Sequence, residues 1–398
     1  MNDSVKSSSF SMSTGGLFHR LMLLVRLVEA NRDHPWRRIA VFVGITWLPL
    51  LILTAIDSTL TGAGIKLTFL HDPVPHVRYL IAMPLLVIAE RVIDPYLHAI
   101  LQHFGTSGLV SDDAKPLYDK ALQRLNRLKD TMWVDVALFL FAFSLGWIFE
   151  FASGLSTMDQ ESSSWMLTVA GEAKDLTPAG WWFLLISIPL LQFFVYRWIW
   201  RLIIWIGFMN QISRIRLVLQ PAHPDRSGGL GILSRGQASF GVVFAALSAM
   251  KSSTLAHEIM YEGRAISDIQ WEVIGHVLIC FAIVTGPLCT FFSNLLNTKR
   301  EGLRTYGTLG YRLTETFHKK WIKNLSKEKG GGLITAIDPS AMADYTAVYE
   351  TVSGIKLIPL NRSSVIWLVL ILVGPFIPLV FTQFSVKEAL QQLINTFV

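Results

Sequence analysis

Residues 38–56, RIAVFVGITWLPLLILTAI, decide the fold class of this chain. After Arg38 the stretch contains no charged side chain. An α-helix of about 20 apolar residues is long enough to cross the hydrocarbon core of a bilayer. The stretch therefore predicts a transmembrane helix.

Comparable apolar runs recur along the whole chain. They lie at residues 78–98, 132–153, 180–207, 237–260, 272–296 and 364–382. The composition agrees, because 52% of the residues are hydrophobic and only 16% are charged, whereas soluble domains carry about a quarter charged residues. We predict an all-α polytopic transmembrane bundle of about seven spans. The clearly apolar part of 237–260 is short, so a re-entrant segment is the alternative there.

The distribution of Lys and Arg predicts the orientation. Basic side chains gather before the first span and in the segments 99–131, 208–236 and 297–362, whereas the 154–178 loop is mainly acidic. Loops rich in Lys and Arg stay on the cytoplasmic side. We therefore expect a cytoplasmic N-terminus in a bacterial inner membrane. The same rule explains the net charge of +6 without a nucleic-acid partner.

The pattern divides the chain into four segments. We expect a disordered, Ser-rich tail over residues 1–16, without a cleavable signal peptide, and a transmembrane domain over 17–296 that opens with an interfacial helix. A basic cytoplasmic helical segment follows over 297–362, its first helix continuing directly from the sixth span. Residues 363–398 are expected to form the last span and an amphipathic C-terminal helix. The Gly-Pro pairs at 286–287 and 374–375 are expected to kink their spans.

Ionisable residues at membrane depth are costly and are candidates for function. Glu90, Asp94 and His98 are four residues apart, so one helix face presents all three. Pro95 follows Asp94 and is expected to weaken the helix there.

The fourth run carries Arg197 and Arg201, also four apart. At about 1.5 Å per residue, Asp94 and Arg197 fall at the same depth in the inner half of the membrane. We therefore predict that these two residues are coupled. Three interpretations stay open: a structural ion pair that joins two helices, snorkelling of Arg201 to the interface, and a polar path or gate for a solute.

The loop HPDRSGGLG, residues 223–231, is the second candidate site. Its glycines permit positive φ, so successive N–H groups can form an anion-binding nest beside a helix N-terminus. We predict that it binds an anion or a lipid head group. The residues expected to contribute are His223, Asp225, Arg226, Gly228, Gly229, Gly231 and Arg235. The alternative is a rigid hairpin in which His223 and Asp225 cap the local backbone.

No catalytic or cofactor motif is recognised. The loop is not a P-loop, because no Lys-Ser/Thr pair follows its glycines. The sequence HEIMYE at 257–262 lacks the second histidine of HExxH, and Cys280 and Cys289 share one apolar run, so no metal site or cofactor is expected. His276 is expected to be a hydrogen-bonded core histidine. Asp135 is expected to pair with a nearby Arg or Lys.

Four stretches resemble a group of bacterial polytopic membrane proteins of unassigned function. These are HPDRSGGLG, MYEG at 260–263, KREGLRTYGTLG at 299–310 and IDPSAMAD at 337–344. The resemblance covers roughly the second half of the chain and implies a bacterial inner-membrane protein. It carries over no catalytic or binding residue.

These patterns favour an oligomeric channel or transporter for ions or small solutes, including small anions. The expected partners are membrane lipids and further copies of the chain. The alternatives are a scaffold or sensor partner without chemistry of its own, and a lipid- or phosphate-handling protein that uses the HPDRSGGLG loop. An enzymatic activity is left open, and the balance is against one.

Overall fold

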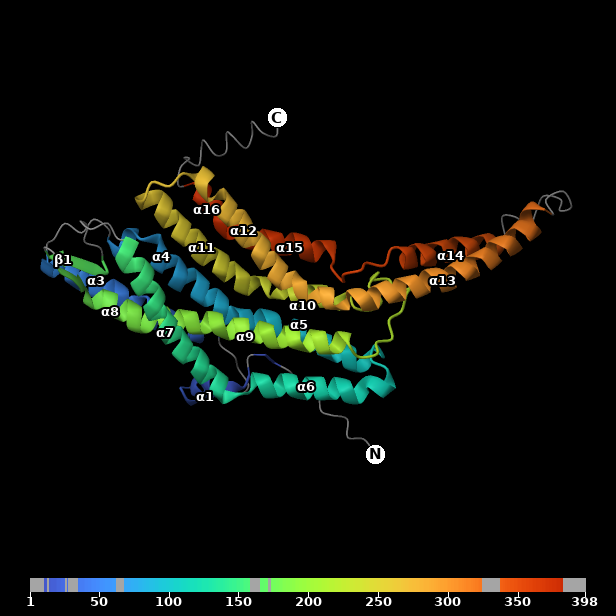
Figure 1. Cartoon of the computed structure of the whole chain (residues 1–398), viewed down its shortest axis with the longest axis horizontal. Helices are drawn as coiled ribbons and strands as arrows, with labels where there is room; N and C mark the ends of the chain where they lie inside the picture. The colour runs from blue at the N-terminus through green and yellow to red at the C-terminus, as the bar shows by residue number, and fades with distance from the viewer. Residues whose placement is uncertain are drawn as a thin grey trace.

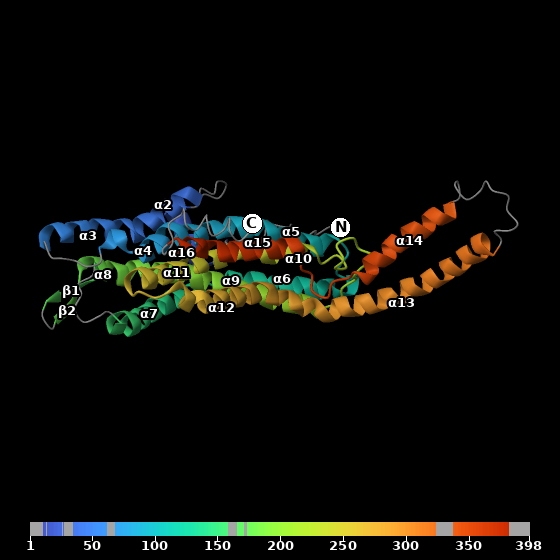
Figure 2. The ribbon, with the colours of Figure 1, turned by 90° about the horizontal axis from the view of Figure 1, so that it is seen from above.

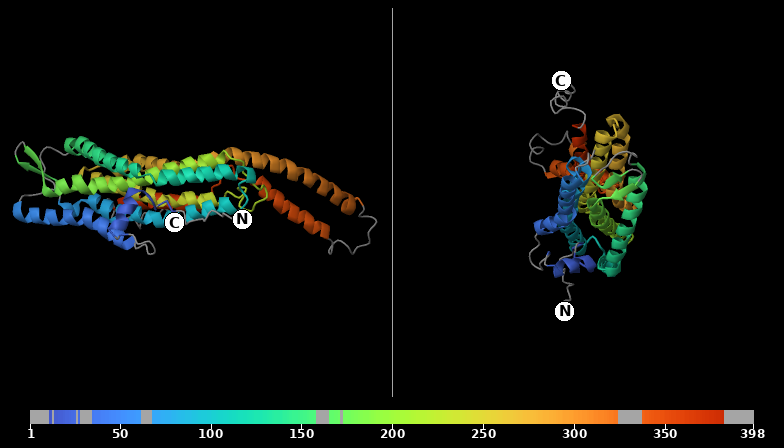
Figure 3. Two further views of the ribbon diagram at one scale, coloured as in Figure 1. Left: turned by 90° about the horizontal axis from the view of Figure 1, so that it is seen from below. Right: turned by 90° about the vertical axis from the view of Figure 1, so that its left-hand side faces the viewer.

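The computed structural model describes residues 11–12, 14–25, 27, 35–61, 68–157, 165–170, 173–323 and 337–381. Over these residues the chain forms an elongated bundle of helices that run back and forth along one axis (Figure 1). Viewed along that axis, the helices pack side by side (Figure 3). The all-α class is thereby confirmed.

The N-terminal half contains helices on both sides of a buried central helix. Its elements are α1 (Gly16–Leu24), α2 (Pro35–Thr46), α3 (Leu48–Thr61), η1 (Phe69–His71), α4 (Pro73–His76), η2 (Val77–Ala82), α5 (Met83–Thr106), η3 (Asp112–Ala114), α6 (Lys115–Lys129) and α7 (Met132–Thr157). A two-stranded antiparallel hairpin follows, formed by β1 (Leu167–Ala170) and β2 (Ala173–Leu176). The sequence did not predict this hairpin.

The second half continues with long helices. Its elements are α8 (Pro178–Trp182), η4 (Phe183–Ser187), α9 (Ile188–Ser213), α10 (Ile232–Ser239), α11 (Gly241–Tyr261), α12 (Ile266–Thr285), η5 (Gly286–Phe291), α13 (Phe292–Phe317), η6 (His318–Ile322), α14 (Ile337–Ser353), α15 (Arg362–Val373), η7 (Gly374–Phe376) and α16 (Ile377–Val380). Both expected Gly-Pro kinks coincide with 3₁₀ turns, η5 and η7.

Five helical stretches of the described chain are long and apolar enough to cross a membrane, which indicates an integral membrane protein. They are Pro35–Asp57, Pro178–Arg214, Ile232–Tyr261, Ile266–Ile322 and Arg362–Val380. The run at 78–98 is helical but carries several charged residues, and it is not among these five stretches. Within 132–153, the residues Met132–Ser144 form an apolar helix that is shorter than a membrane span. The count of seven therefore stays a prediction. The fifth run forms one unbroken 21-residue helix, α11.

Helices α5 and α9 form the core of the bundle. Buried aromatic side chains on α9 anchor it to its neighbours: Trp198 Nε1 donates to the Leu86 carbonyl on α5, 2.9 Å away, and Trp205 Nε1 donates to Gln237 Oε1 on α10, 3.1 Å away. By contrast, α12 and α15 expose large apolar side chains such as Trp271 and Trp367. Apolar side chains face outward where a helix borders lipid.

The sixth apolar run continues into a long helical rod, as predicted. Residues Ile266–Ile322 are helical over 57 residues. Helix α14 runs back along α13, and the two project together beyond the other helices (Figure 2). Gly310 on α13 lets Tyr345 of α14 approach closely, and the Tyr345 hydroxyl donates to the Tyr306 carbonyl, 2.6 Å away.

The two ends of the chain are described only in part. Residues 1–10 of the expected tail and 382–398 of the expected C-terminal helix lie outside the described residues, as does the glycine run 330–332. Within 11–16, the stretch expected to be disordered, Met12 is 1% exposed and α1 already begins at Gly16. This stretch packs against α5, because the Met12 N–H donates to Asp94 Oδ1, 2.9 Å away.

Candidate functional site

Glu90 is the centre of a buried charge cluster. Its side chain lies on α5 and receives hydrogen bonds from three arginines on two other helices. Arg38 of α2 donates to Oε2 at 2.5 Å, while Arg197 and Arg201 of α9 donate to Oε1 at 3.1 and 3.0 Å. The four residues are at most 5% exposed. Charges removed from water need such pairing, since an isolated buried charge is very unfavourable.

The two α9 arginines have further partners that fix their planes. Arg197 Nε lies 3.9 Å from Asp135 Oδ1 on α7, and its guanidinium stacks 4.7 Å from the ring centroid of Phe18 on α1. The Arg201 guanidinium lies 4.8 Å from the Trp198 ring. These are cation–π distances. The cluster thus joins α1, α2, α5, α7 and α9, and the expected pairing of Asp135 with an arginine is confirmed.

The predicted coupling of Asp94 to Arg197 stays a prediction, because the carboxylate that contacts Arg197 directly is that of Glu90. Asp94 is only partly buried and accepts hydrogen bonds from the Ser11 hydroxyl and the Met12 N–H. Glu90, one turn earlier on α5, faces Arg197 instead. Glu90 and Asp94 lie on the same face of α5, about one turn apart along the axis, and depth counted from the ends of apolar runs is too coarse to separate them.

His98 lies two turns after Glu90 on α5, and its proposed place at the transport path stays a prediction. Helix α5 continues through Pro95 to Thr106, so the expected weakening at the proline does not occur. His98 is partly buried, and its Nδ1 has no hydrogen-bond partner among the described residues. No contact between His98 and the Glu90 cluster is recorded within the described chain.

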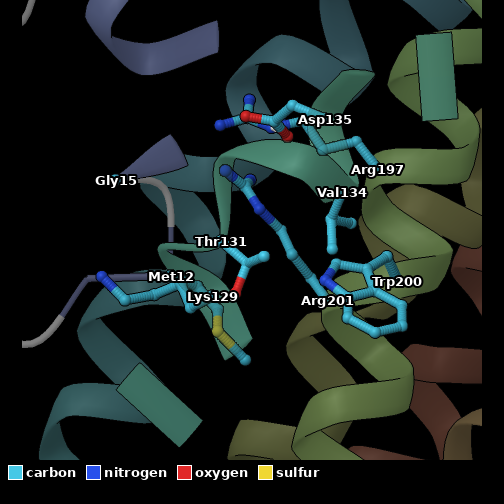
Figure 4. Close-up of a pocket in the computed structure, with 9 residues that line it drawn as sticks. All are labelled: Met12, Gly15, Lys129, Thr131, Val134, Asp135, Arg197, Trp200 and Arg201. Carbon is cyan, nitrogen blue, oxygen red and sulfur yellow. Dashed lines mark ion pairs between the residues drawn. The ribbon is translucent and has the colours of Figure 1, made fainter. Parts of the chain in front are cut away.

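A small cavity of about 10 Å³ adjoins the cluster. This is about the space that one water molecule needs. The residues that line it are Met12, Gly15, Lys129, Thr131, Val134, Asp135, Arg197, Trp200 and Arg201 (Figure 4). Trp200 Nε1 is buried and has no acceptor among the described residues. The lining of the cavity is therefore rich in hydrogen-bond donors, which suits a water oxygen or a small anion.

The N-terminal segment forms one wall of this cavity. Met12 and Gly15 come from that segment, whereas Arg197, Trp200 and Arg201 come from α9 on the other side (Figure 4). Three hydrogen bonds hold the segment in place: Met12 N–H to Asp94 at 2.9 Å, Lys129 Nζ to the Thr14 carbonyl at 2.8 Å, and Phe18 N–H to Asp135 at 3.0 Å. The wall depends on residues that the sequence assigned to a disordered tail.

His19 on α1 responds to the same charges from outside the spans. Burial lowers the pKa of its imidazole; Glu90 opposes this, and Arg197, Arg38 and Arg201 lower the pKa further. The ring is therefore neutral at pH 7. Protonation would add a positive charge beside three guanidinium groups.

The HPDRSGGLG loop does form a nest of N–H groups, but its own Asp225 occupies the nest. The Asp225 carboxylate accepts from the N–H groups of Ser227 at 2.7 Å, Gly229 at 3.1 Å and Gly231 at 2.8 Å. His223 Nδ1 lies 2.8 Å from Asp225 Oδ1. Burial on its own raises the pKa of this carboxyl, but the three backbone N–H groups and His223 hold it below its ordinary value.

The glycines of the loop are needed for this geometry. Gly228 and Gly229 have φ of 64° and 98°, and a Cβ on Gly231 would lie 2.8 Å from Asp225 Oδ2. Arg226, at φ 53°, is the non-glycine residue of the loop in this strained region. Of the two interpretations, the rigid hairpin capped by Asp225 and His223 describes these contacts. The N–H groups of Gly229 and Gly231, two of the residues expected to contribute to an anion site, are engaged by Asp225.

The loop also joins parts of the chain that are far apart in sequence. The Gly229 carbonyl lies 3.0 Å from His103 Nε2 on α5, and the Arg226 carbonyl accepts from the Lys356 N–H at 2.8 Å. The Gly231 carbonyl accepts from Asn361 Nδ2 at 3.5 Å, just before α15. Arg235 is exposed on α10. The loop therefore locks the base of the α13–α14 rod to the bundle.

The remaining sequence candidates have structural partners. His276 Nε2 lies 3.1 Å from Ser248 Oγ, which confirms a hydrogen-bonded core histidine. His257 Nδ1 lies 3.4 Å from Asp72 Oδ1, and Glu258 pairs with Arg264. In the part of the chain that the structure describes, His, Cys, Asp and Glu side chains nowhere gather as three ligands for a metal ion.

Sequence reasoning missed Arg38, which is 3% exposed and contacts Glu90 directly. It stands at the start of the first span and was grouped with the basic residues of the membrane edge. A signal was present, because Arg38 is the charge nearest the apolar run and an acidic partner at similar depth was known. The sequence contained no such signal for the contacts that Ser11 and Met12 make with Asp94.

In comparisons with known proteins, no family model matches the chain, and neither a curated protein nor a solved structure matches it.

Proposed function

We propose that this membrane protein transports a small anion, with Glu90, Arg197 and Arg201 beside the path. The observation that carries the proposal is the donor-rich cavity next to the buried cluster, where two guanidinium groups, Lys129 and the Trp200 indole N–H outnumber the single carboxylate of Asp135. Fixed donors in a site that excludes water attract negative charge more strongly than they do in bulk solvent. Intramembrane charges of this kind mark solute paths.

The described conformation corresponds to a closed state in this proposal. The cavity has room for one water-sized species only. Met12 is almost fully buried at its wall, and Asp94 holds Ser11 and Met12 in place. The N-terminal segment then acts as a gate on the cytoplasmic side, where the basic flank is expected to lie. Asp94 contributes to gating rather than to the path.

The test is anion flux into proteoliposomes that contain the purified chain. We compare the wild type with a form that lacks residues 1–14 and with Arg201→Gln. We expect deletion to raise the flux several-fold and Arg201→Gln to reduce the flux of the deleted form. Arg304→Gln, an exposed arginine on α13, is the matched control and should change nothing. Flux no higher than in protein-free liposomes from either form would exclude this function.

A second candidate is a scaffold or sensor partner without transport. The projecting α13–α14 hairpin supports it, because a helical rod beyond the bundle offers a surface to another protein (Figure 2). This alternative expects no flux and stable association with a partner that depends on the hairpin. Removing residues 304–350 would then abolish the association while the transmembrane helices stay folded.

Assembly of several copies is part of the first proposal. The exposed apolar side chains on α12 and α15, such as Leu278 and Leu370, support it, since a second copy can cover them as well as lipid can. Light scattering in mild detergent measures the mass. A single monomeric species would contradict assembly without bearing on transport.

A further inference from the structure

A groove between α6 and α9 carries a second, separate site. Helix α6 packs against the cytoplasmic half of α9, where Tyr118 and Phe208 meet with ring centroids 6.3 Å apart. Beside this contact lies an open groove of about 600 Å³. A second hollow of about 190 Å³ shares Ala121, Arg124, Leu128 and Gln211 with it. The two form one continuous groove along α9.

The two ends of the groove differ in chemistry. Toward the centre of the bundle it is lined by Trp200, Ile203, Ile204, Gly207 and Phe208. Toward the cytoplasmic end it is lined by Lys120, Arg124, Arg127 and Arg214. All four basic side chains are exposed. Among the described residues that line the groove there is no carboxylate, and none of the four bases has an ion-pair partner in the described chain.

The groove lies at the level where the last candidate span begins. Trp205, between Ile203 and Gly207 on α9, donates to Gln237 on α10. Three residues earlier on α10, Ser234 accepts from the N–H of Asn361, which immediately precedes the span Arg362–Val380. The apolar part of the groove is therefore next to the hydrocarbon, and the basic part is next to the head groups.

We propose that this groove binds an anionic glycerophospholipid of the cytoplasmic leaflet. An acyl chain lies along Ile203 and Gly207, and the phosphate lies among Arg124, Arg127 and Arg214. Basic pockets between helices on the cytoplasmic side bind anionic head groups. The apolar length favours a lipid over free phosphate, which needs no hydrocarbon surface. The lipid proposal does not rest on the proposed transport, although Trp200 lines both the cavity and the groove.

Native mass spectrometry tests the proposal on the full chain in mild detergent with added phosphatidylglycerol or phosphatidylethanolamine. We expect the wild type to retain phosphatidylglycerol preferentially. Arg124→Gln combined with Arg214→Gln should reduce that retention roughly tenfold or more. Arg304→Gln combined with Arg312→Gln removes two exposed bases from α13 and should leave it unchanged.

A second variant pair tests the acyl-chain part without removing charge. A Cβ on Gly207 or on Gly275 meets no atom within 4 Å, so neither site is constrained by packing. Gly207→Leu fills the groove and should lower retention several-fold, whereas Gly275→Leu on α12 should not. Both variants should stay folded, because replacing glycine inside a helix favours the helix.

Three results would overturn the proposal. Equal retention of both lipids would remove the head-group preference. Displacement of the lipid by millimolar inorganic phosphate, with Gly207→Leu unaffected, would indicate a free-phosphate site. A wild-type dimer that Gly207→Leu converts to monomers would show that a second copy occupies the groove.

Discussion

Arg201 Nη1 lies 3.0 Å from Glu90 Oε1, although the two residues are 111 positions apart in sequence. The contact joins α5 and α9 through a charge-assisted hydrogen bond. Arg38 and Arg197 share the same carboxylate. The packing of α2, α5 and α9 therefore depends on one side chain, and the predictions below start from it.

Glu90→Gln is expected to destabilise the fold far more than Asp94→Asn. The first change leaves buried guanidinium groups without the carboxylate they share, and breaking a buried ion pair costs about 3–5 kcal/mol. Asp94 is partly exposed, and an amide oxygen can still accept from the Met12 N–H, so its loss should cost about 1 kcal/mol. Thermal unfolding followed by tryptophan fluorescence measures both. Equal shifts in Tm would refute the central position of Glu90.

Arg38 and Glu90 should be energetically coupled. Arg38→Gln and Glu90→Gln each leave a charge without its partner, whereas the double variant removes one charge of each sign. We expect the double variant to be more stable than the sum of the single effects predicts, by about 1–3 kcal/mol. The same cycle with Asp94→Asn in place of Glu90→Gln is the control and should be additive.

The HPDRSGGLG loop should depend on ionised Asp225. Asp225→Asn puts an NH₂ group among backbone donors and is expected to cost about 1–3 kcal/mol. The sign with pH follows from the lowered pKa of this carboxyl. Its contribution is complete above the unfolded-state pKa of about 3.9 and is lost as pH falls through the lower folded-state pKa. Hydrogen exchange at residues 223–231 in acid measures this loss of stability. In Asp225→Asn the dependence on pH should disappear, because the amide does not titrate.

Acidification should loosen α1. The pKa of His19 is lowered in the fold, so the unfolded segment binds a proton more readily than the docked one. The stability of docking should fall as pH drops below about 6.5, the ordinary histidine value. Hydrogen exchange of Gly16–Leu24 at pH 8 and pH 5.5 measures this. In His19→Gln the difference between the two pH values should largely disappear.

Two glycines on α13 test the rod. A Cβ at Gly310 would overlap the Tyr345 hydroxyl, whereas one at Gly307 meets no atom within 4 Å. Gly310→Ala should displace Tyr345 from the Tyr306 carbonyl and loosen α14 by about 1 kcal/mol. Gly307→Ala should instead stabilise α13 slightly. Faster hydrogen exchange of α14 in Gly307→Ala than in Gly310→Ala would contradict the assigned contact.

Much of the fold could be predicted from the sequence. The positions of the apolar runs, the continuous helix from the sixth span into the rod and the Gly-Pro irregularities all follow from properties of neighbouring residues. The contacts of Ser11, Met12 and Thr14 could not be predicted, because the polar composition around them resembles that of a flexible tail. Their partners, Asp94 and Lys129, are distant in sequence.

The candidate sites were predicted less well, for one physical reason. Spacing of four residues correctly placed Arg197 and Arg201 on one face of α9, and glycine spacing correctly predicted a nest in the HPDRSGGLG loop. The sequence by itself determined which groups are charged, how deep they lie and where the backbone can turn. Only the tertiary structure decided that Glu90 rather than Asp94 faces the arginines, and that Asp225 fills the nest. Partner choice depends on how far each helix is shifted along its axis and rotated against its neighbours, and packing over the whole bundle sets both.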